Sequence, residues 1–185
     1  MLGAVVATRR CMIIVKFARR LRRTVRSIEG GPQLSRRPFG EVTYRLAKEE
    51  TQQVRRFLAR EWPAADRAIF GEDCDWTSLP VVVEARAGGQ TVGAVLGEVI
   101  AGIARLHDLL VVEDRRNHGI GGHLVEAFCD RAAALGAARC YLRCPATERH
   151  RRFYERLGFA QVARLPRYYH DHDFLEYLRE PLLRG

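Results

Sequence analysis

The sequence lacks the features that mark membrane-spanning, secreted and zinc-binding proteins. Its five cysteines are odd in number and show no paired spacing, which predicts neither a disulfide framework nor a zinc site, so we expect no metal. No apolar run approaches the roughly 18 residues that a membrane-crossing helix requires. Residues 1–8 are apolar but lack the preceding positive charges of a secretory signal. We therefore expect a cytoplasmic protein without a membrane span.

The excess of positive charge is confined to the first 40 residues. Ten of the 31 Lys and Arg residues lie there, against Glu29 alone. Residues 41–185 then hold 21 basic and 21 acidic side chains, because the chain totals are 31 and 22. We expect residues 1–40 to form a basic tail, either disordered or a short amphipathic helix, and residues 41–185 to form one domain.

Apolar periodicity in residues 41–185 predicts alternating strands and helices. Helices are expected at 48–62, from Ile120 to Leu135, and at 147–157 with Thr147 as the N-cap. Strands are expected at 41–46, 81–86, 91–100, 103–112, 138–144, 159–165 and 173–180, with a loop at Pro166 between the last two. This order predicts an α/β (α+β) fold with a mixed, mostly antiparallel central sheet of six to seven strands flanked by helices.

A glycine-rich segment, Arg115–Gly122 (RRNHGIGG), lies between an apolar strand and a helix. Glycines let the backbone approach a ligand closely, and the first amides of a helix have no partners, so the segment predicts an anion site. A Walker loop would need Lys-Ser/Thr after the last glycine, and a dinucleotide fingerprint would need glycine at 124, where the chain has Leu124. The remaining interpretation is a backbone cradle for a pyrophosphate.

The run LHDLLVVEDRRNHGIGGHL, followed by FYERLGF, resembles the acetyl-CoA-binding core of the GCN5-related N-acetyltransferase (GNAT) superfamily. Arg116, Gly119 and Gly121 match the motif Arg/Gln-x-x-Gly-x-Gly/Ala, and residues 153–159 match a second signature. The resemblance covers about residues 41–185. It implies a GNAT-like fold and an N-acetyltransferase that moves an acetyl group from acetyl-CoA to a primary amine of a small molecule or protein by direct attack.

The resemblance also implies a cofactor-binding surface. The backbone amides of residues 117–122 would hold the pyrophosphate, and the backbone of residues 109–111 would pair with the pantetheine arm. The residues expected to bind acetyl-CoA are Leu109, Leu110, Val111, Arg116, Asn117, His118, Gly119, Ile120, Gly121 and Gly122. Basic residues at 149–152 either contact the 3′-phosphate or form a solvated helix face.

Tyr154 is the catalytic acid that the resemblance implies, because the tyrosine of FYE often protonates the departing thiolate in this superfamily. Relatives that read Leu-Glu-Asp in the preceding strand use the glutamate as the base, and here His107 stands in its place. Histidine accepts a proton near neutral pH, so His107 is one candidate base, with Asp108 and an ordered water as alternatives. Strand alternation puts His107 and Asp108 on opposite faces unless a bulge intervenes.

Two other functional classes stay open at this point. The substitution of His107 for glutamate is compatible with a catalytically weak acyl-CoA-binding sensor of the same fold. The Arg-rich tail is compatible with binding to nucleic acid or an anionic membrane, although the charge balance of residues 41–185 predicts no nucleic-acid binding by the domain. The resemblance also implies that residues 168–170 lie at positions that line the acceptor site in relatives. It is compatible with a homodimer.

Overall fold

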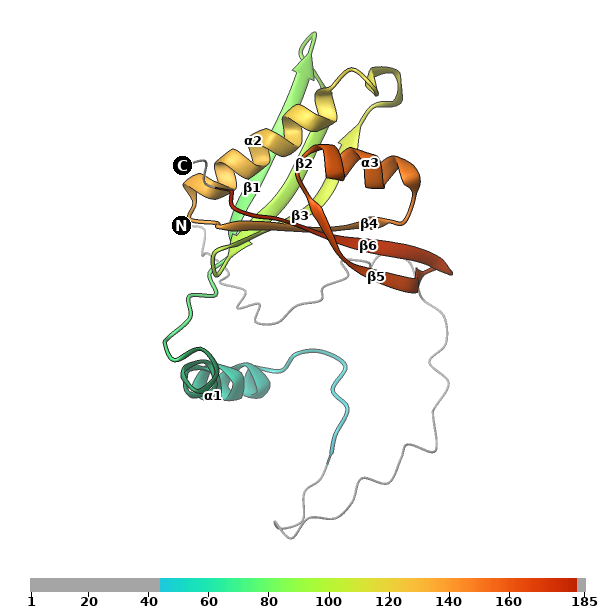
Figure 1. Ribbon diagram of the computed structural model, residues 1–185. Helices are drawn as coiled ribbons and strands as arrows, with labels where there is room; N and C mark the ends of the chain where they lie inside the picture. Colours follow the sequence, from blue (N-terminus) through green and yellow to red (C-terminus); the bar gives the residue numbers. More distant parts are fainter. Residues whose placement is uncertain (1–43, 183–185) are drawn as a thin grey trace. The chain divides into compact units, whose positions relative to one another are not determined.

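The computed structural model describes residues 44–182, which fall into two compact units, one ending at Cys74 and the other beginning at Asp75 (Figure 1). The predicted basic tail, residues 1–40, lies outside the described residues. The division into a tail and a single domain therefore stays a prediction. Each unit is described by itself.

The first unit contains one helix, α1 (Gln52–Phe70). The side chain of Thr51 caps it by accepting a hydrogen bond from the backbone amide of Val54 at 3.3 Å, and Gly71 ends it in a left-handed conformation with φ of 80°. The helix starts four residues later than predicted and continues through Pro63, so the predicted span of 48–62 was wrong at both ends.

The predicted strand at 41–46 is not formed in its described part. Residues 41–43 lie outside the described range, and residues 44–46 are irregular. Tyr44 and Leu46 are fully or almost fully exposed. Alternation of apolar and polar residues produces a strand only where a partner strand supplies hydrogen bonds, and residues 44–46 pair with no strand of the described chain.

The second unit is built on a sheet of six strands in the order β1-β2-β3-β4-β6-β5. The pair β3–β4 is parallel and the other four neighbouring pairs are antiparallel, which confirms the predicted mixed, mostly antiparallel sheet. The strands are β1 (Leu79–Ala87), β2 (Gln90–Ile100), β3 (Ile103–Val111), β4 (Arg139–Pro145), β5 (Ala160–Tyr169) and β6 (His172–Arg179).

Two helices lie over one face of this sheet (Figure 1). Helix α2 (Ile120–Ala134) contacts β1, β2 and β3, and α3 (Glu148–Arg156) contacts β5. Thr147 caps the start of α3, because its hydroxyl accepts a hydrogen bond from the amide of His150. This confirms Thr147 as the predicted N-cap. The face of the sheet turned away from α2 and α3 is called the second face below.

Alternation along each strand sends every second side chain into a core between the sheet and the two helices. Phe128 and Val125 of α2 are completely buried there, together with Val95 of β2 and Cys140 of β4. Their burial fixes α2 across β1–β3 and thereby fixes the position of its first turn. A 3₁₀ helix, η1 (Glu113–Arg115), and a short loop connect β3 to that turn.

The last two strands form a hairpin that differs from the prediction. The loop expected at Pro166 is part of β5, and the turn falls at His170 and Asp171, both with positive φ. The register between β5 and β6 is irregular from Leu165 to Tyr169, and β5 is an edge strand. Proline is tolerated at an irregular edge because no ladder hydrogen bond is lost there, which explains why Pro166 does not end the strand.

Two irregularities of β3 shape the functional region. A bulge interrupts its pairing with β2, since Leu96 pairs with Asp108 whereas Gly97 pairs with Leu106, which leaves His107 as the extra residue. On the other side, β3 pairs with β4 only from Ile103 to Leu106. Beyond that point the two parallel strands diverge (Figure 1), and the edge of β3 that faces β4 has no partner among the described strands.

Candidate active site

A cleft with a volume of about 670 Å³ lies beside the divergent end of β3. Three segments line it: the end of β3, the loop with the first turn of α2, and α3. The lining residues are Leu109, Leu110, Val111, Arg115, Arg116, Asn117, Gly119, Gly121, Gly122, Arg149, His150, Phe153, Tyr154, Arg156 and Leu157. The structure thus brings the glycine segment and the FYERLGF segment, some thirty residues apart, to one cavity.

The first turn of α2 presents backbone amides to this cleft. Gly119 precedes the helix with φ of 81°, and Asn117 also has a positive φ, of 66°. These left-handed residues bend the loop sharply, and glycine adopts that conformation at no steric cost. No side chain of residues 44–182 caps the helix. The amide of His123 donates a hydrogen bond to the carbonyl of Gly119, the residue that precedes the helix. The amides before His123 are the ones that a helix leaves without an intrahelical partner.

Arg116 holds this loop against the preceding strand. Its Nε donates a hydrogen bond to the carbonyl oxygen of Val111 at 3.0 Å. The first residue of the glycine motif is therefore engaged with the protein backbone, and its role in the described structure is to fix the loop at the end of β3.

The unpaired edge of β3 presents its backbone to the same cleft. The amide of Val112 bonds to the carbonyl of Val92 on β2, at 3.0 Å. Since successive amides of a strand point in opposite directions, the amide of Val111 points away from β2, toward the side where β4 has diverged. An extended ligand with amide groups could therefore add to this edge as a strand does.

Basic side chains contribute to the lining of the cleft. Arg115, Arg149 and Arg156 line it, whereas Arg151 and Arg152 of the same helix form ion pairs with Glu148, at 2.7 and 2.6 Å. His150 also lines the cleft, and burial, reinforced by the charge of Arg149, lowers the pKa of its imidazole, which is therefore neutral at pH 7. The basic residues predicted at 149–152 thus divide into Arg149 and His150, which face the cleft, and two surface ion pairs.

Tyr154 is a nearly buried residue of the cleft lining. Its ring is 5% exposed and makes edge contacts with Phe153 and Phe159, with ring centroids 4.9 and 5.8 Å apart. Burial, with the nearby thiols of Cys144 and Cys140, raises the pKa of the Tyr154 hydroxyl. The hydroxyl therefore keeps its proton at neutral pH and can act as a hydrogen-bond donor in the cleft.

The buried thiols beside Tyr154 are poor nucleophiles. Burial raises the pKa of Cys144 to about 12, and the pKa of Cys140 is also raised, through its contact with the Cys129 thiol and burial. Because the thiolate is the reactive form, neither cysteine is suited to carry an acyl group.

The two predicted candidates for the base lie before the cleft on β3 and do not line it. Asp108 pairs with Leu96, and His107 occupies the bulge. The Nε2 atom of His107 lies 3.2 Å from Oε1 of Glu98 on β2. Of the predicted cofactor residues, His118 and Ile120 do not line the cleft either, and the side chain of Ile120 packs against the core.

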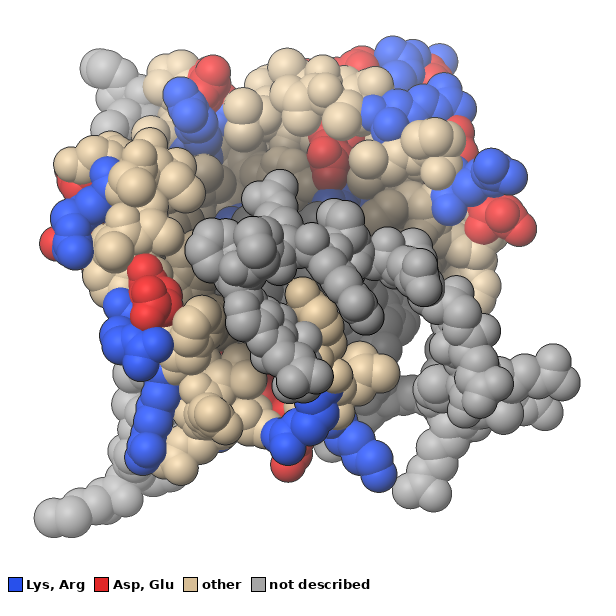
Figure 2. All heavy atoms as spheres, turned by 90° about the horizontal axis from the view of Figure 1, so that it is seen from below, with Lys and Arg blue, Asp and Glu red and all other residues tan. Residues whose placement is uncertain are grey.

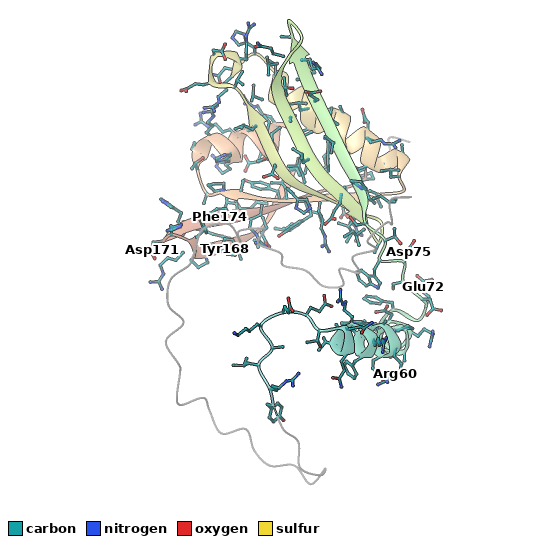
Figure 3. The ribbon with its side chains drawn as sticks, turned by 180° about the vertical axis from the view of Figure 1, so that it is seen from behind. Arg60, Glu72, Asp75, Tyr168, Asp171 and Phe174 are labelled. Atoms are coloured by element: carbon teal, nitrogen blue, oxygen red, sulfur yellow. The ribbon has the colours of Figure 1, made fainter. Side chains whose placement is uncertain are left out.

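Sequence reasoning missed Arg143 and Glu176, which form a polar cluster on the second face of the sheet with Tyr168, one of the residues predicted to line the acceptor site. Arg143 of β4 donates to Glu176 of β6 from Nε and Nη2, at 3.0 and 2.7 Å, and its guanidinium lies 4.5 Å from the ring centroid of Tyr168. Tyr168 in turn contacts Phe174, with centroids 5.2 Å apart, near the end of the β5–β6 hairpin (Figure 3). The sequence held one signal for this cluster: along β4 and β6, the charged residues Arg143 and Glu176 each lie between two apolar residues, as expected for side chains on opposite faces of a sheet.

Charges on the visible surface are mixed in sign. Where Figure 2 shows described residues, Lys and Arg side chains are interspersed with Asp and Glu side chains. Within residues 44–182, no group of three or more His, Cys, Asp or Glu side chains could hold a metal ion. None of the helices in that range is long and apolar enough to cross a membrane.

Comparisons with known proteins agree with this geometry. The profile of the Acetyltransferase (GNAT) family matches residues 44–159, which include the glycine loop and the FYERLGF segment. A search among curated proteins gave no match.

Solved structures of acetyltransferases share the fold. An acetyltransferase from Bacillus cereus superposes with a TM-score of 0.60 at 15% identity, covering 74% of this chain and 97% of its own. The ribosomal-protein-S18-alanine N-acetyltransferase from Escherichia coli gives a TM-score of 0.53 at 22% identity, over 57% and 72% of the two chains. An aminoglycoside 6′-N-acetyltransferase complexed with coenzyme A gives 0.51 at 22% identity, over 57% and 74%. These structures show the fold that the chain shares with them. The profile match spans more than half of the chain and shows that the chain belongs to the GNAT family of acetyltransferases.

Proposed function

We propose that the protein is an N-acetyltransferase that uses acetyl-CoA and acetylates a primary amine by direct attack. The observation that carries the proposal is the cleft itself. The cleft brings together three features of the described residues: the helix amides without a side-chain cap, the strand edge without a partner, and the Tyr154 hydroxyl. The first could bind a diphosphate, the second could pair with an arm that contains amide groups, and the third could donate a proton to a departing sulfur.

Acetyl-CoA would bind along these features in order. The amides of residues 117–122 would donate hydrogen bonds to the pyrophosphate, and a hydrogen bond to a charged acceptor contributes about 1.5–3 kcal/mol. The backbone of Leu109 to Val111 would pair with the pantetheine amides. Arg149 and Arg156 in the lining of the cleft would face the 3′-phosphate, which supports a preference for coenzyme A over its dephosphorylated form.

The thioester supplies an activated acetyl group, and the chain's residues must then manage two protons. An amine with a pKa near 10.4 is protonated at pH 7, and removing that proton costs about 4–5 kcal/mol. His107 would accept it, with Asp108 as the alternative. Tyr154 would donate a proton to the sulfur as it leaves.

The state of the cysteines supports direct attack. The alternative, transfer through an acyl-enzyme, needs a reactive thiolate near the thioester, and burial keeps Cys144 protonated. The thiols of Cys129, Cys140 and Cys144 are buried and none of the three is in a disulfide. This is in keeping with a reducing compartment, and on that ground we propose that the protein is cytoplasmic.

The acceptor is either a protein amine or a small molecule. Two of the solved structures above carry names with these two acceptor classes, a ribosomal protein alanine and an aminoglycoside. The mixed charge of the face shown in Figure 2 supports neither a polycation nor a polyanion as the acceptor.

A titration and a thiol-release assay together test the proposal. Calorimetry with acetyl-CoA should show binding to one site, and release of free coenzyme A should depend on an added amine from a panel of amino acids, peptides with free N-termini, polyamines and aminoglycosides. Binding without amine-dependent release from any of them would instead support an acyl-CoA-binding sensor. Absence of binding would refute both.

A further inference from the structure

The carboxylate of Glu98 contacts His107, the candidate base, from the neighbouring strand. Glu98 lies on β2, and its Oε1 atom is 3.2 Å from Nε2 of His107 across the β2–β3 pair. Its other oxygen, Oε2, accepts a hydrogen bond from the hydroxyl of Ser78 at 2.5 Å. Both carboxylate oxygens are therefore engaged, and the Glu98 side chain is only 16% exposed, against 49% for His107.

The bulge in β3 is what allows this contact. His107 is the extra residue between the pairs Leu96–Asp108 and Gly97–Leu106, so its side chain does not follow the strict alternation of the strand. Gly97 is needed opposite the bulge, because a Cβ atom there would lie 2.1 Å from the carbonyl oxygen of Arg105 and 2.7 Å from the ring of Phe128. The packing of α2 onto β2 thus fixes the backbone that brings His107 to Glu98.

Glu98 is ionised at neutral pH, so it acts as a hydrogen-bond acceptor. Burial alone would raise its pKa, but the hydrogen bonds from Ser78 and His107 and the charges of His107 and Arg105 outweigh burial, and the net pKa is lowered. A carboxylate can only accept, and the Nε2 atom of His107 must then carry the hydrogen. In the neutral imidazole, this leaves the lone pair on Nδ1.

We propose that Glu98 is a positioning residue for the reaction, which holds His107 in the tautomer and orientation that direct the Nδ1 lone pair to the ammonium group of the acceptor. This inference rests on the proposed function and names a residue that the glycine and FYERLGF segments do not contain. Ser78 in turn holds Glu98 from the segment that precedes β1.

The proton balance of the step is simple. The acceptor's N–H bond breaks, the Nδ1–H bond of His107 forms, and the nitrogen lone pair that is released attacks the thioester carbonyl. The imidazolium forms beside the Glu98 carboxylate, which stabilises its charge. The ring of His107 is half exposed, so the proton can then pass to solvent and regenerate the neutral tautomer.

A double-mutant cycle separates positioning from a merely structural role. Glu98→Gln keeps the shape of the side chain, but its amide can donate to Nε2 and allow the proton to move to Nδ1. We expect this variant to lower kcat about tenfold or more, with KM for acetyl-CoA within about twofold of the wild type. In a His107→Ala background, Glu98→Gln should change kcat little, because the residue that it positions is gone.

The tautomer is measured directly on the protein labelled with ¹⁵N-histidine. At pH 8 the resonances of His107, assigned with the His107→Ala variant, should show Nε2 protonated and Nδ1 bare in the wild type. Glu98→Gln should shift the ring toward the other tautomer. The matched control is Glu84→Gln on β1, whose carboxylate contacts Thr91 and Arg86, and it should leave both kcat and the His107 resonances unchanged.

Three results would overturn the inference. The first is wild-type kcat in Glu98→Gln, and the second is an equal loss in the wild-type and His107→Ala backgrounds. The third is a His107 ring that carries its proton on Nδ1 in the wild type. If the wild type binds acetyl-CoA but transfers no acetyl group, the proposed function fails on its own, and the ¹⁵N spectrum still decides whether Glu98 sets the tautomer.

Discussion

The guanidinium of Arg116 is tied to the carbonyl oxygen of Val111, 3.0 Å away, at the end of the strand that precedes the glycine loop. Arg116 is the first residue of the motif that defines the cradle, and Val111 belongs to the strand edge that would pair with the pantetheine arm. The hydrogen bond therefore joins the two halves of the proposed acetyl-CoA site, and its removal should disturb both.

Arg116→Ala is expected to weaken acetyl-CoA binding about tenfold, because a charge-assisted hydrogen bond of roughly 1.5–3 kcal/mol no longer holds the loop. Calorimetry measures the change. Arg116→Lys keeps the positive charge but has no Nε–H in the position that reaches Val111, so it should bind as weakly as Arg116→Ala. Full binding by the lysine variant would show that Arg116 acts through its charge alone.

Gly122→Ala should separate folding from binding. A Cβ atom at residue 122 would meet nothing nearer than Leu157, at 3.7 Å, and alanine favours a helix over glycine by up to about 1 kcal/mol, so urea unfolding should show unchanged or greater stability. The added methyl group would project where the phosphates approach the amides, and acetyl-CoA affinity should fall at least tenfold. Unchanged affinity would place the diphosphate elsewhere.

Tyr154→Phe should lower kcat by roughly 10²-fold or more, with the Kd for acetyl-CoA nearly unchanged, since the variant keeps the ring packing and loses only the donor to the departing sulfur. The matched control is Tyr177→Phe on β6. The Tyr177 hydroxyl is buried and has no partner among the described residues, so its removal should leave kcat unchanged and raise the free energy of unfolding by about 1 kcal/mol. Equal effects of the two variants on kcat would remove Tyr154 from the mechanism.

Glu176 should make stability depend on pH in the acid range. Burial alone would raise its pKa, but hydrogen bonds from Tyr141 and Arg143 and the charge of Arg143 outweigh it, so the folded pKa lies below the ordinary value of 4.5. The contribution of ionised Glu176 to the free energy of unfolding is therefore complete above pH 4.5, and it is lost as the pH falls through the pKa of the folded state. Urea unfolding at pH 7 should show Glu176→Gln less stable by about 1–2 kcal/mol, and the difference should shrink toward pH 3. A difference that grows in acid would contradict this sign.

The elements around the cleft could be predicted because local patterns determine them. The stripe of Leu124, Phe128 and Ala132 defines α2, and the Thr147 side chain caps the start of α3. The glycine spacing identifies the loop that precedes α2. The predictions that were wrong concern features that depend on contacts with other parts of the fold. Pro166 stays within β5 because that strand is a bulged edge, and residues 44–46 form no strand because no partner is present in the described chain.

The sequence could predict the site residues that lie in continuous motifs, but not the contacts between side chains on neighbouring strands. The residues near Gly121 and Tyr154 lie in continuous motifs, whereas the contact between Glu98 and His107 depends on the register of β2 against β3 and on a bulge of one residue. Register is set by packing over many residues, and a shift of one position would have moved His107 away from Glu98. The Arg143–Glu176 pair depends in the same way on the register of β4 against β6.

The most direct test of the acetyl-CoA site is a titration of ¹⁵N-labelled protein with acetyl-CoA, followed by amide NMR spectra. The account predicts that the largest shifts fall on the amides of residues 117–122 and on Leu109 and Val111, and that coenzyme A lacking the acetyl group reproduces the shifts of residues 117–122. Saturable binding that leaves these amides in place while others shift would contradict the proposed cradle at the start of α2.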